Sequence, residues 1–280
     1  MPLVAERLGL RLVQLTADLL NPALPVHLLA DQVRKIKVLQ RRYGIGIPHI
    51  LTGALTRVNH LAHPDPKVRA YWVIWFRRLV DLSVALGAES MGSHFGILTV
   101  PDYHDSKVRA LRIRQNLEGW WGISAYAARR GLRYLVWEPM SIPREYGETI
   151  ERALELHRAV NRKAKLPFKV CLDVDHGDVA SPNPRDTDPY AWIKAFGREA
   201  PIIHLKQTTA DKRGHWPFTR EFNRDGKITP PKILRALQEA GVEEVTLFLE
   251  LSFRERQPFE GRVVKDLMAS VRYWRPYVAV

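Results

Sequence analysis

Short apolar runs alternate with helical patterns along this chain, and that alternation limits the fold more than any other feature. Strands separated by helices form parallel sheets that the helices cover. Four of the runs also lead into a possible metal ligand or acid–base group: Glu138, Asp173, His204 and Glu250. Because the carboxyl ends of the strands share one face of an α/β barrel, we expect these four side chains to meet there.

The alternation predicts an α/β fold, a TIM (β/α)8-type barrel that lacks or truncates its first strand. Seven strands are predicted, at residues 10–15, 45–52, 88–93, 132–138, 168–173, 201–205 and 245–250. Helices are predicted at residues 24–42, 66–86, 105–129, 148–162, 189–196, 230–240 and 259–274. A complete barrel has eight strands. Residues 2–9 have the pattern of a helix end, so the first strand would precede Met1, unless the start is misassigned or another segment substitutes.

Composition restricts the function classes. The chain has 43 Lys and Arg against 30 Asp and Glu, a net charge of +13. This charge suits nucleic-acid binding, attraction of a small anionic substrate, or a charge-rich surface of the thermophile kind. The basic residues are spread over many helices, which favours the last two over nucleic acid. A single cysteine, Cys171, excludes an internal disulfide.

The sequence predicts a single domain in the cytoplasm. No composition break or flexible linker divides the chain, so residues 1–280 are expected to form a single barrel domain. The apolar runs are too short to span a membrane, and no signal-peptide pattern precedes the first predicted strand.

Glu138, Asp173, His204 and Glu250 form a set of three carboxylates and one imidazole. Such hard ligands suit one divalent metal ion, with Mn²⁺ favoured and Mg²⁺, Co²⁺ or Zn²⁺ as alternatives. Each residue alone has a second explanation, as a helix cap or a buried, hydrogen-bonded polar group. Four such residues at four strand ends are harder to explain in that way, because charged side chains are rarely buried without a partner.

Several further residues are candidates for substrate binding. His176 follows Asp173 by three residues, and His94 ends an earlier strand, where a structural role in the core is an equal alternative. Two basic clusters also follow strand ends: Lys206, Lys212, Arg213 and His215 in one, Arg254 and Arg256 in the other. Solvated charge runs would explain these clusters, but their place beside two strand ends favours contacts with a substrate phosphate. A Walker loop, a Gly-x-Ser-x-Gly elbow and a Rossmann glycine motif are all missing from the sequence.

The order of these residues resembles that of the xylose isomerase-like TIM-barrel superfamily of sugar isomerases and epimerases, and within it the ketose 3-epimerase branch. Residues 57–66 (RVNHLAHPDP), 172–178, 186–192 and 215–218 resemble the D-erythrulose 1-phosphate 3-epimerase group. The resemblance implies the four metal ligands named above, an acid–base pair of Glu138 and Glu250, a substrate contact by His176, and a homo-oligomer. Epimerases of unphosphorylated sugars carry an Arg where this chain has Ala210, a departure that suits a different substrate tail.

The implied chemistry is proton transfer next to a ketone. A metal on the ketone and hydroxyl oxygens would stabilise the developing ene-diolate, while one carboxylate removes the proton and an opposite one returns it. The expected function is metal-dependent epimerisation or isomerisation of a ketose or ketose phosphate, with a tetrulose phosphate favoured. Epimerisation and aldose–ketose isomerisation would use the same residues. The alternatives are an abasic-site endonuclease-like phosphodiesterase, which needs a multi-zinc cluster with more histidines, and a non-catalytic sugar-phosphate binding protein.

Overall fold

Seven parallel strands form one curved sheet in the computed structural model, which describes residues 1–209, 214–253 and 260–279. The strands follow one another in chain order across the sheet. They are β1 (Leu15–Thr16), β2 (His49–Leu51), β3 (Ser90–His94), β4 (Tyr134–Glu138), β5 (Phe168–Asp173), β6 (Ile202–Leu205) and β7 (Thr246–Leu249). The predicted seven-stranded architecture of the TIM-barrel type is therefore confirmed.

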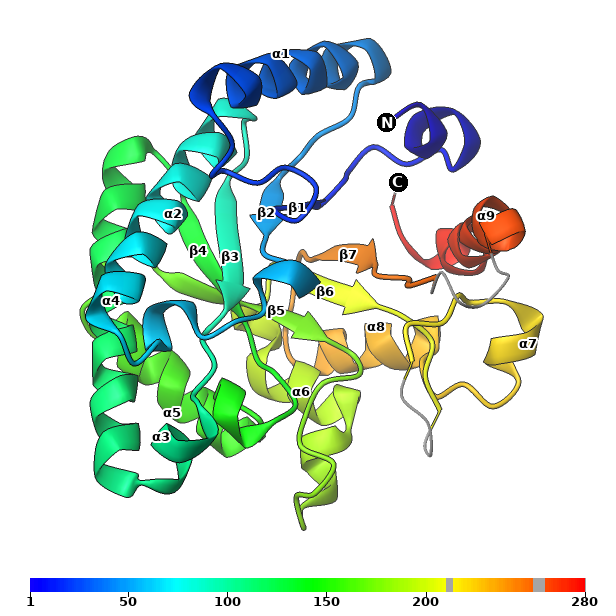
Figure 1. The fold of residues 1–280 in the computed structure, drawn as a ribbon. Helices are drawn as coiled ribbons and strands as arrows, with labels where there is room; N and C mark the ends of the chain where they lie inside the picture. The colour runs from blue at the N-terminus through cyan, green and yellow to red at the C-terminus, as the bar shows by residue number, and fades with distance from the viewer. Residues whose placement is uncertain (210–213, 254–259, 280) are drawn as a thin grey trace.

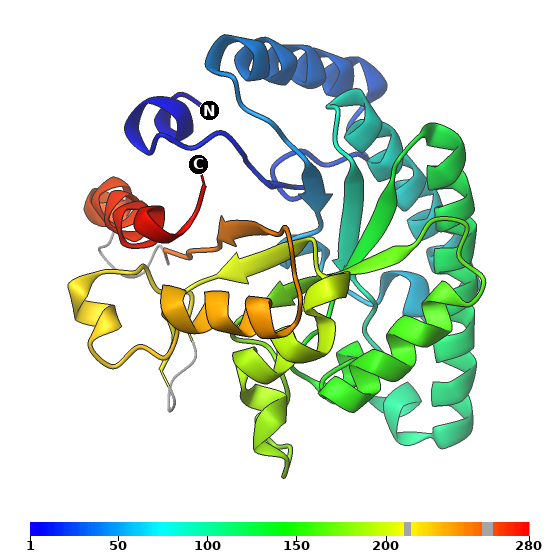
Figure 2. The ribbon, with the colours of Figure 1, turned by 180° about the vertical axis from the view of Figure 1, so that it is seen from behind.

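Helices cover the outer face of this half-barrel (Figures 1 and 2). Their bounds are α1 (Val26–Tyr43), α2 (Pro66–Ala85), α3 (Val100–His104), α4 (Ser106–Arg130), α5 (Ile150–Asn161), α6 (Pro189–Phe196), α7 (Arg220–Asn223), α8 (Pro230–Glu239) and α9 (Val263–Trp274). Helix α4 is capped at its N-terminus by Asp105, whose side chain accepts from two backbone N–H groups, and at its C-terminus by Gly131 in the left-handed conformation. Both are common helix-terminating arrangements. In the described part of the chain, no helix is long and apolar enough to cross a membrane.

The packing of α4 fixes the end of strand β3. Trp120 is 1% exposed and packs on Phe76 of α2, with ring centroids 4.7 Å apart. Its Nε1 donates to the carbonyl of Phe95 at 2.9 Å, and Asn116 Nδ2 donates to the same oxygen at 2.9 Å. Two buried donors thus hold the residue that directly follows His94, so core packing sets the position of this predicted site residue.

Strand register brings the predicted ligands to one level. His94 is the partner of Glu138 in the β3–β4 ladder, and Asp173 is the partner of His204 in the β5–β6 ladder. The backbone N–H of Glu250 donates to the carbonyl of Leu205 at 2.9 Å, one residue beyond the end of β7. These pairings place all five side chains at the carboxyl ends of their strands.

The structure differs from the prediction near the N-terminus and in two loops. Residues 10–15 were expected to form a strand, but β1 covers only Leu15–Thr16, with an isolated bridge at Leu12. Residues Leu3–Arg7 form a short π-helix, within the stretch 2–9 where the end of a helix was predicted. Helix α3, whose first turn contains Pro101, and the four-residue α7 both lie where no helix was predicted.

The two chain ends close the side of the sheet between β1 and β7. Among the described residues these two strands do not pair with each other. Figures 1 and 2 show the N-terminal segment beside α9, and Arg275 Nη2 donates to the carbonyls of Leu8 and Gly9 at 2.9 and 3.3 Å. Gln14 reaches across this side to accept from His204 Nε2 at 2.7 Å. A hydrogen bond from before β1 therefore supports a predicted metal ligand on β6.

Candidate active site at the carboxyl ends of the strands

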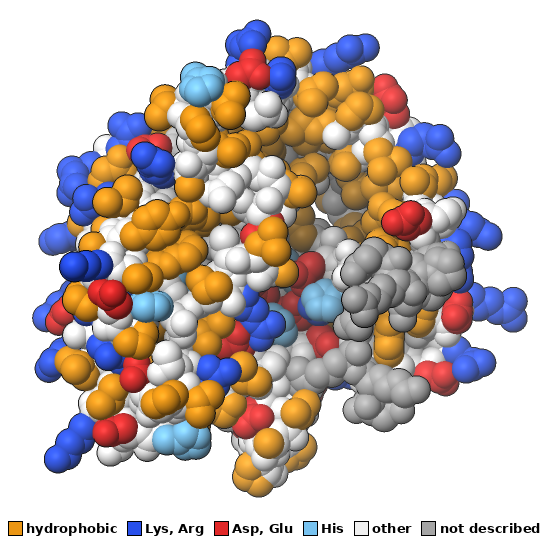
Figure 3. Space-filling model, viewed as in Figure 1, with side chains coloured by type: hydrophobic (Ala, Val, Ile, Leu, Met, Phe, Trp, Pro, Cys, Tyr) orange, Lys and Arg blue, Asp and Glu red, His pale blue; other side chains and the backbone are white. Residues whose placement is uncertain are grey.

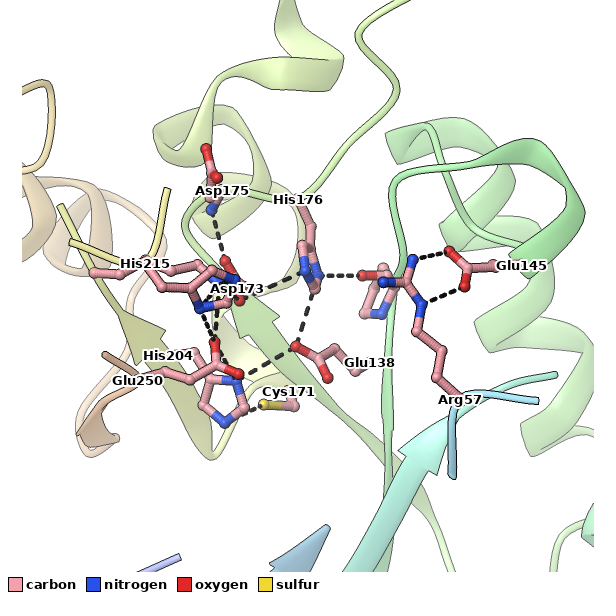
Figure 4. A network of polar contacts seen from close by, with 12 residues as sticks. Arg57, Glu138, Glu145, Cys171, Asp173, Asp175, His176, His204, His215 and Glu250 are labelled. Atoms are coloured by element: carbon pink, nitrogen blue, oxygen red, sulfur yellow. Dashed lines mark hydrogen bonds and ion pairs between the residues drawn. The ribbon is translucent and has the colours of Figure 1, made fainter. Parts of the chain in front are cut away.

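The four predicted ligands gather in one cluster of side chains (Figure 4). His204 Nδ1 is 3.3 Å from Glu138 Oε1 and 3.5 Å from Glu250 Oε2. Asp173, His204 and Glu250 offer ligand atoms within 4.8 Å of one another, as do Glu138, Asp173 and His176. The strands β4 to β7 thus contribute one group each to a single cluster.

Lys206 lies inside this cluster and not in an exposed basic patch. Its Nζ donates to Asp173 Oδ2 and, at 2.8 Å, to Glu250 Oε2. The side chains of Lys206 and Asp173 are both 0% exposed, whereas that of Glu250 is 40% exposed. Lys206 follows His204 by two residues, and side chains two apart along an extended chain point the same way. The ammonium is therefore a buried counter-ion of two predicted ligands.

His176 lies between a backbone carbonyl and two carboxylates, and its Nδ1 is also 3.6 Å from Glu138 Oε1. Its Nδ1 donates to the carbonyl of Pro139 at 2.8 Å, and its Nε2 is 3.6 Å from Asp173 Oδ2. Gly177 follows with a φ of +115°, and a Cβ at this position would collide with the carbonyl oxygen of Asp186. The sharp turn at Gly177 thus fixes the direction in which His176 leaves β5.

The cluster is buried at its floor and open at its mouth. The His204 side chain is 4% exposed and Glu138 is 14% exposed, while Glu250 and His215 are each 40% exposed. His215 lies 3.2 Å from Lys206 Nζ through Nδ1. Figure 3 shows acidic and histidine side chains at the centre of this face, in a hollow. A small molecule can reach the carboxylates from that side.

The surroundings move the pKa values of the two predicted acid–base residues apart. Burial alone would raise the pKa of Glu138, but the interaction with His204 outweighs it and holds this pKa below its usual range. Burial, followed by the negative charge of Asp173, raises the pKa of Glu250 to about 7. Two carboxyl groups with separated pKa values can take different roles in acid–base chemistry.

At the floor of the site, the pKa values of the buried acidic and basic groups depend on one another's charges. Burial opposes ionisation of Asp173, yet the charges of His176 and Lys206 lower its pKa well below the usual value. Burial likewise opposes the charge of Lys206, but Asp173 and Glu250 raise its pKa. Burial raises the pKa of Cys171 to about 12, so this thiol stays protonated and inert at neutral pH.

These residues fit a divalent metal ion. Among the described residues, Glu138 Oε1 and His204 Nδ1 are buried without a hydrogen-bond partner, although they face each other at 3.3 Å. The other ring nitrogen of His204 donates to Gln14 Oε1, which leaves Nδ1 as the atom that can coordinate. Carboxylate oxygens with one imidazole are ligands that Mn²⁺ and Mg²⁺ accept. The pKa of His204 is raised, against burial, by Cys171 and Glu138, so coordination would release a proton.

The remaining predicted residues have different positions. His94 is 4% exposed and its Nε2 donates to the carbonyl of Val58 at 3.1 Å, so it supports the loop after β2. Arg213, Arg254 and Arg256 lie outside the described residues. A separate cavity of about 570 Å³ between α7 and α9 contains none of the predicted site residues.

Two features of the site were missed by the sequence prediction. Gln14 was assigned only to a strand, although it orients His204 from 190 positions away. Arg57 binds Glu145 through both carboxylate oxygens at 2.5 and 2.6 Å, near the mouth of the cluster (Figure 4). The only signal for Arg57 was its place in residues 57–66, a stretch on which the family resemblance rests.

The chain is similar to proteins whose names describe sugar isomerases and epimerases. The chain is 40% identical over 276 residues to the D-erythrulose 1-phosphate 3-epimerase of Brucella abortus (strain 2308), covering 98% of this chain and 89% of that protein. It superimposes on a provisionally named xylose isomerase of Rhodospirillum rubrum ATCC 11170 with a TM-score of 0.89 at 22% identity, covering 99% and 93% of the two chains. The D-psicose 3-epimerase of Clostridium cellulolyticum H10 gives a TM-score of 0.72 at 16% identity, covering 99% and 92%.

The predicted resemblance to sugar isomerases and ketose 3-epimerases is confirmed by these matches. The family model described as "Xylose isomerase-like TIM barrel" matches residues 3–274, nearly the whole chain. The two solved structures agree with the observed arrangement of strands and helices. The chain therefore belongs to the xylose isomerase-like TIM-barrel family.

Proposed function

We propose that this protein is a divalent-metal-dependent 3-epimerase of a ketose phosphate, with a tetrulose phosphate as its substrate. The meeting of Glu138, Asp173, His204 and Glu250 at one end of the sheet carries the proposal. The 40% identity to a D-erythrulose 1-phosphate 3-epimerase supports the choice of substrate. The expected enzyme class, an isomerase, is confirmed by this relative.

In this proposal Glu138 and Glu250 are the acid–base pair. They approach His204 Nδ1 from β4 and from the end of β7, at 3.3 and 3.5 Å. In the proposal the substrate carbon lies between these two carboxylates. The bound metal would supply Lewis-acid stabilisation of the negative charge that develops on the substrate oxygens. One carboxylate takes the proton beside the ketone, and the opposite one returns it to the other face of the same carbon, which inverts that carbon.

Two neighbours would hold the substrate and the carboxylates in place. The Nδ1 of His176 is bound to the carbonyl of Pro139, which leaves its Nε2 to contact a substrate oxygen. Asp173 and Lys206 are fully buried and exclude water from the floor of the site. The substrate would therefore enter from the open side, where Glu250 is 40% exposed.

Turnover in deuterated water tests the proposal. The protein with Mn²⁺ is incubated with tetrulose phosphates and with a panel of ketohexoses, and the products are followed by NMR. Inversion with deuterium incorporation at the carbon next to the ketone is expected, whereas deuterium on the former ketone carbon would indicate aldose–ketose isomerisation. Lack of turnover on every ketose, or full activity after the metal is stripped, would refute the proposal.

The rival functions have weaker support. Each described group of residues that could hold a metal contains a single imidazole, whereas a multi-zinc phosphodiesterase needs several. A metal content near one ion per chain would support the epimerase. All four predicted ligands, including the two proposed acid–base residues, lie at the same ends of the strands, which speaks against a non-catalytic binding protein. A single domain over residues 1–280, a homo-oligomer and a cytoplasmic location stay predictions.

A further inference from the structure

Arg57 lies at the mouth of the site, on the loop after β2, and is anchored by a buried carboxylate that the proposed chemistry does not use. Its Nε and Nη2 donate to the two oxygens of Glu145 at 2.5 and 2.6 Å. The side chain of Glu145 is 1% exposed and that of Arg57 is 45% exposed. The ion pair is therefore fixed in the protein on one side and open to solvent on the other.

The backbone around Arg57 is held on both sides of the residue. Before it, the short helix Ala54–Thr56 is tied down by Asp18, which accepts from Leu55 N at 2.9 Å and from Thr56 Oγ1 at 3.2 Å. After it, the carbonyl of Val58 accepts from His94 Nε2 at 3.1 Å. A guanidinium on such a backbone, with a bidentate carboxylate partner, loses little freedom when it binds a ligand.

The guanidinium has unused donors. An arginine carries five N–H donors in a planar fork, and Glu145 takes one from Nε and one from Nη2. In residues 1–209, 214–253 and 260–279, no acceptor is bound to Nη1. One edge of the guanidinium is thus occupied, and the other can form the paired hydrogen bonds that arginine makes with phosphate oxygens.

The position of Arg57 relative to the carboxylates suits a terminal phosphate. In the view of Figure 4 its guanidinium lies between Glu145 and His176. Glu145 chiefly, and Glu138 in addition, raise the pKa of Arg57, so the side chain stays cationic within electrostatic range of a proposed catalytic residue. In a tetrulose the phosphate is at most two carbons from the ketone, so the group that binds it must lie at the edge of the carboxylate cluster.

We propose that Arg57 binds the phosphate of the substrate and that Glu145 is its positioning residue. The inference rests on the proposed function and adds to it the side chain that selects a phosphorylated ketose. A phosphate dianion next to Glu138 would be repelled without a cation beside it, and Arg57 supplies that cation in a geometry that a flexible lysine does not. The competing explanation is an ion pair that only joins two loops.

A double variant separates the two explanations. Arg57→Met with Glu145→Gln removes both charges, so no buried carboxylate is left unpaired. The matched control is Arg112→Met with Asp102→Asn, which removes an ion pair of 2.9 Å between α4 and α3. The KM and kcat of both proteins are measured with a tetrulose phosphate and with the same tetrulose without phosphate.

The Arg57 variant is expected to raise the KM for the phosphorylated ketose about 10- to 100-fold, with kcat little changed. Its KM for the unphosphorylated ketose should match that of the control. An equal rise of KM for both substrates, or no rise for the phosphorylated one, would overturn the proposal. Arg57→Lys should recover part of the affinity, because it keeps the charge but not the paired geometry.

Binding of inorganic phosphate gives a readout that does not depend on turnover. Phosphate is titrated into the unmodified protein and into both double variants while the melting temperature is recorded. It should stabilise the unmodified protein and the control but not the Arg57 variant. If the unmodified protein turns over no ketose phosphate, the proposed function fails, and this titration still decides the role of Arg57. Equal stabilisation of all three proteins would contradict that role.

Discussion

Replacement of Lys206 by methionine should destabilise the protein although the two side chains have similar bulk. Lys206 Nζ is bound to Asp173 and Glu250, and its side chain is 0% exposed. Removal of one partner from a buried ion pair typically costs about 3–5 kcal/mol, because the remaining charge is left uncompensated. Glu250 is 40% exposed and is partly screened by solvent. Most of the cost therefore comes from Asp173, and we expect about 3 kcal/mol.

This loss converts into a measurable change of melting temperature. Unfolding entropies are about 2.1 cal/mol/K per residue, so the 280 residues of the chain give roughly 0.6 kcal/mol/K. Lys206→Met should therefore lower the melting temperature by about 5 °C in calorimetry at pH 7 with a chelator present. In the proposed metal site a divalent ion would share the carboxylates that Lys206 holds, so saturating Mn²⁺ should raise the melting temperature of the variant more than that of the unmodified protein.

A lysine on the neighbouring strand serves as the control. Lys169 of β5 pairs with Glu199 at 2.7 Å, but the two side chains are 31% and 45% exposed. Pairs of this kind contribute at most about 1 kcal/mol, so Lys169→Met should shift the melting temperature by no more than about 2 °C. If Lys206→Met melts at or above the temperature of the unmodified protein, the buried ammonium does not compensate Asp173, and our reasoning about the floor of the site is wrong.

Three further outcomes follow from the site and its surroundings. Glu138→Gln and Glu250→Gln should each abolish deuterium exchange at the epimerised carbon, which NMR measures, while circular dichroism stays unchanged. Chelation should abolish turnover, and added Mn²⁺ or Co²⁺ should restore it; activity that persists in metal-stripped protein would contradict the metal site. Burial lowers the pKa of His49 from 6.5 to about 4. Between pH 6.5 and about pH 4 the imidazole is therefore protonated in the unfolded chain but neutral in the folded protein. The contribution of His49 to the free energy of unfolding is fully present above pH 6.5, and about 2 kcal/mol of it should be lost between pH 7.5 and pH 5. Urea unfolding of His49→Gln should show a smaller decrease in the free energy of unfolding over the same pH range.

The positions of the polar residues at the strand ends could be predicted from the sequence, because they depend on local patterns. Apolar runs located β4 to β7 within a few residues, and parallel strands place their carboxyl ends together. The prediction that Glu138, Asp173, His204 and Glu250 share one site needed no further information about long-range contacts. The weaker assignment at residues 10–15 concerned an edge strand, which in the described structure pairs only with β2. A strand with one neighbour has fewer hydrogen bonds to extend it.

Contacts between distant segments could not be read from the sequence. Arg57 and Glu145 are 88 positions apart, and Gln14 and His204 are 190 apart, so no periodic pattern connects them. Lys206 is a different case. It was grouped with the basic residues that follow it, although its spacing of two from His204 predicted the same direction on an extended chain. Strand alternation thus predicted that Lys206 lies on the same side as His204, but the nearby charges of Lys212 and Arg213 made a basic cluster the more evident interpretation.

The balance of charges at the strand ends explains where a phosphate would have to bind. Glu138, Asp173 and Glu250 surround His204, and the ammonium of Lys206 is already shared by two of these carboxylates. The charges of the three carboxylates would be offset by Lys206 and by the proposed divalent ion, so the cluster has no excess positive charge to attract a phosphate dianion. Arg57 uses one edge of its guanidinium to bind Glu145, and its other edge offers a cationic donor outside the cluster of Glu138, Asp173 and Glu250. A substrate held there would point its phosphate toward the loop after β2 and its ketone toward Glu138 and Glu250, so Arg57 would control which ketoses are bound without taking part in proton transfer.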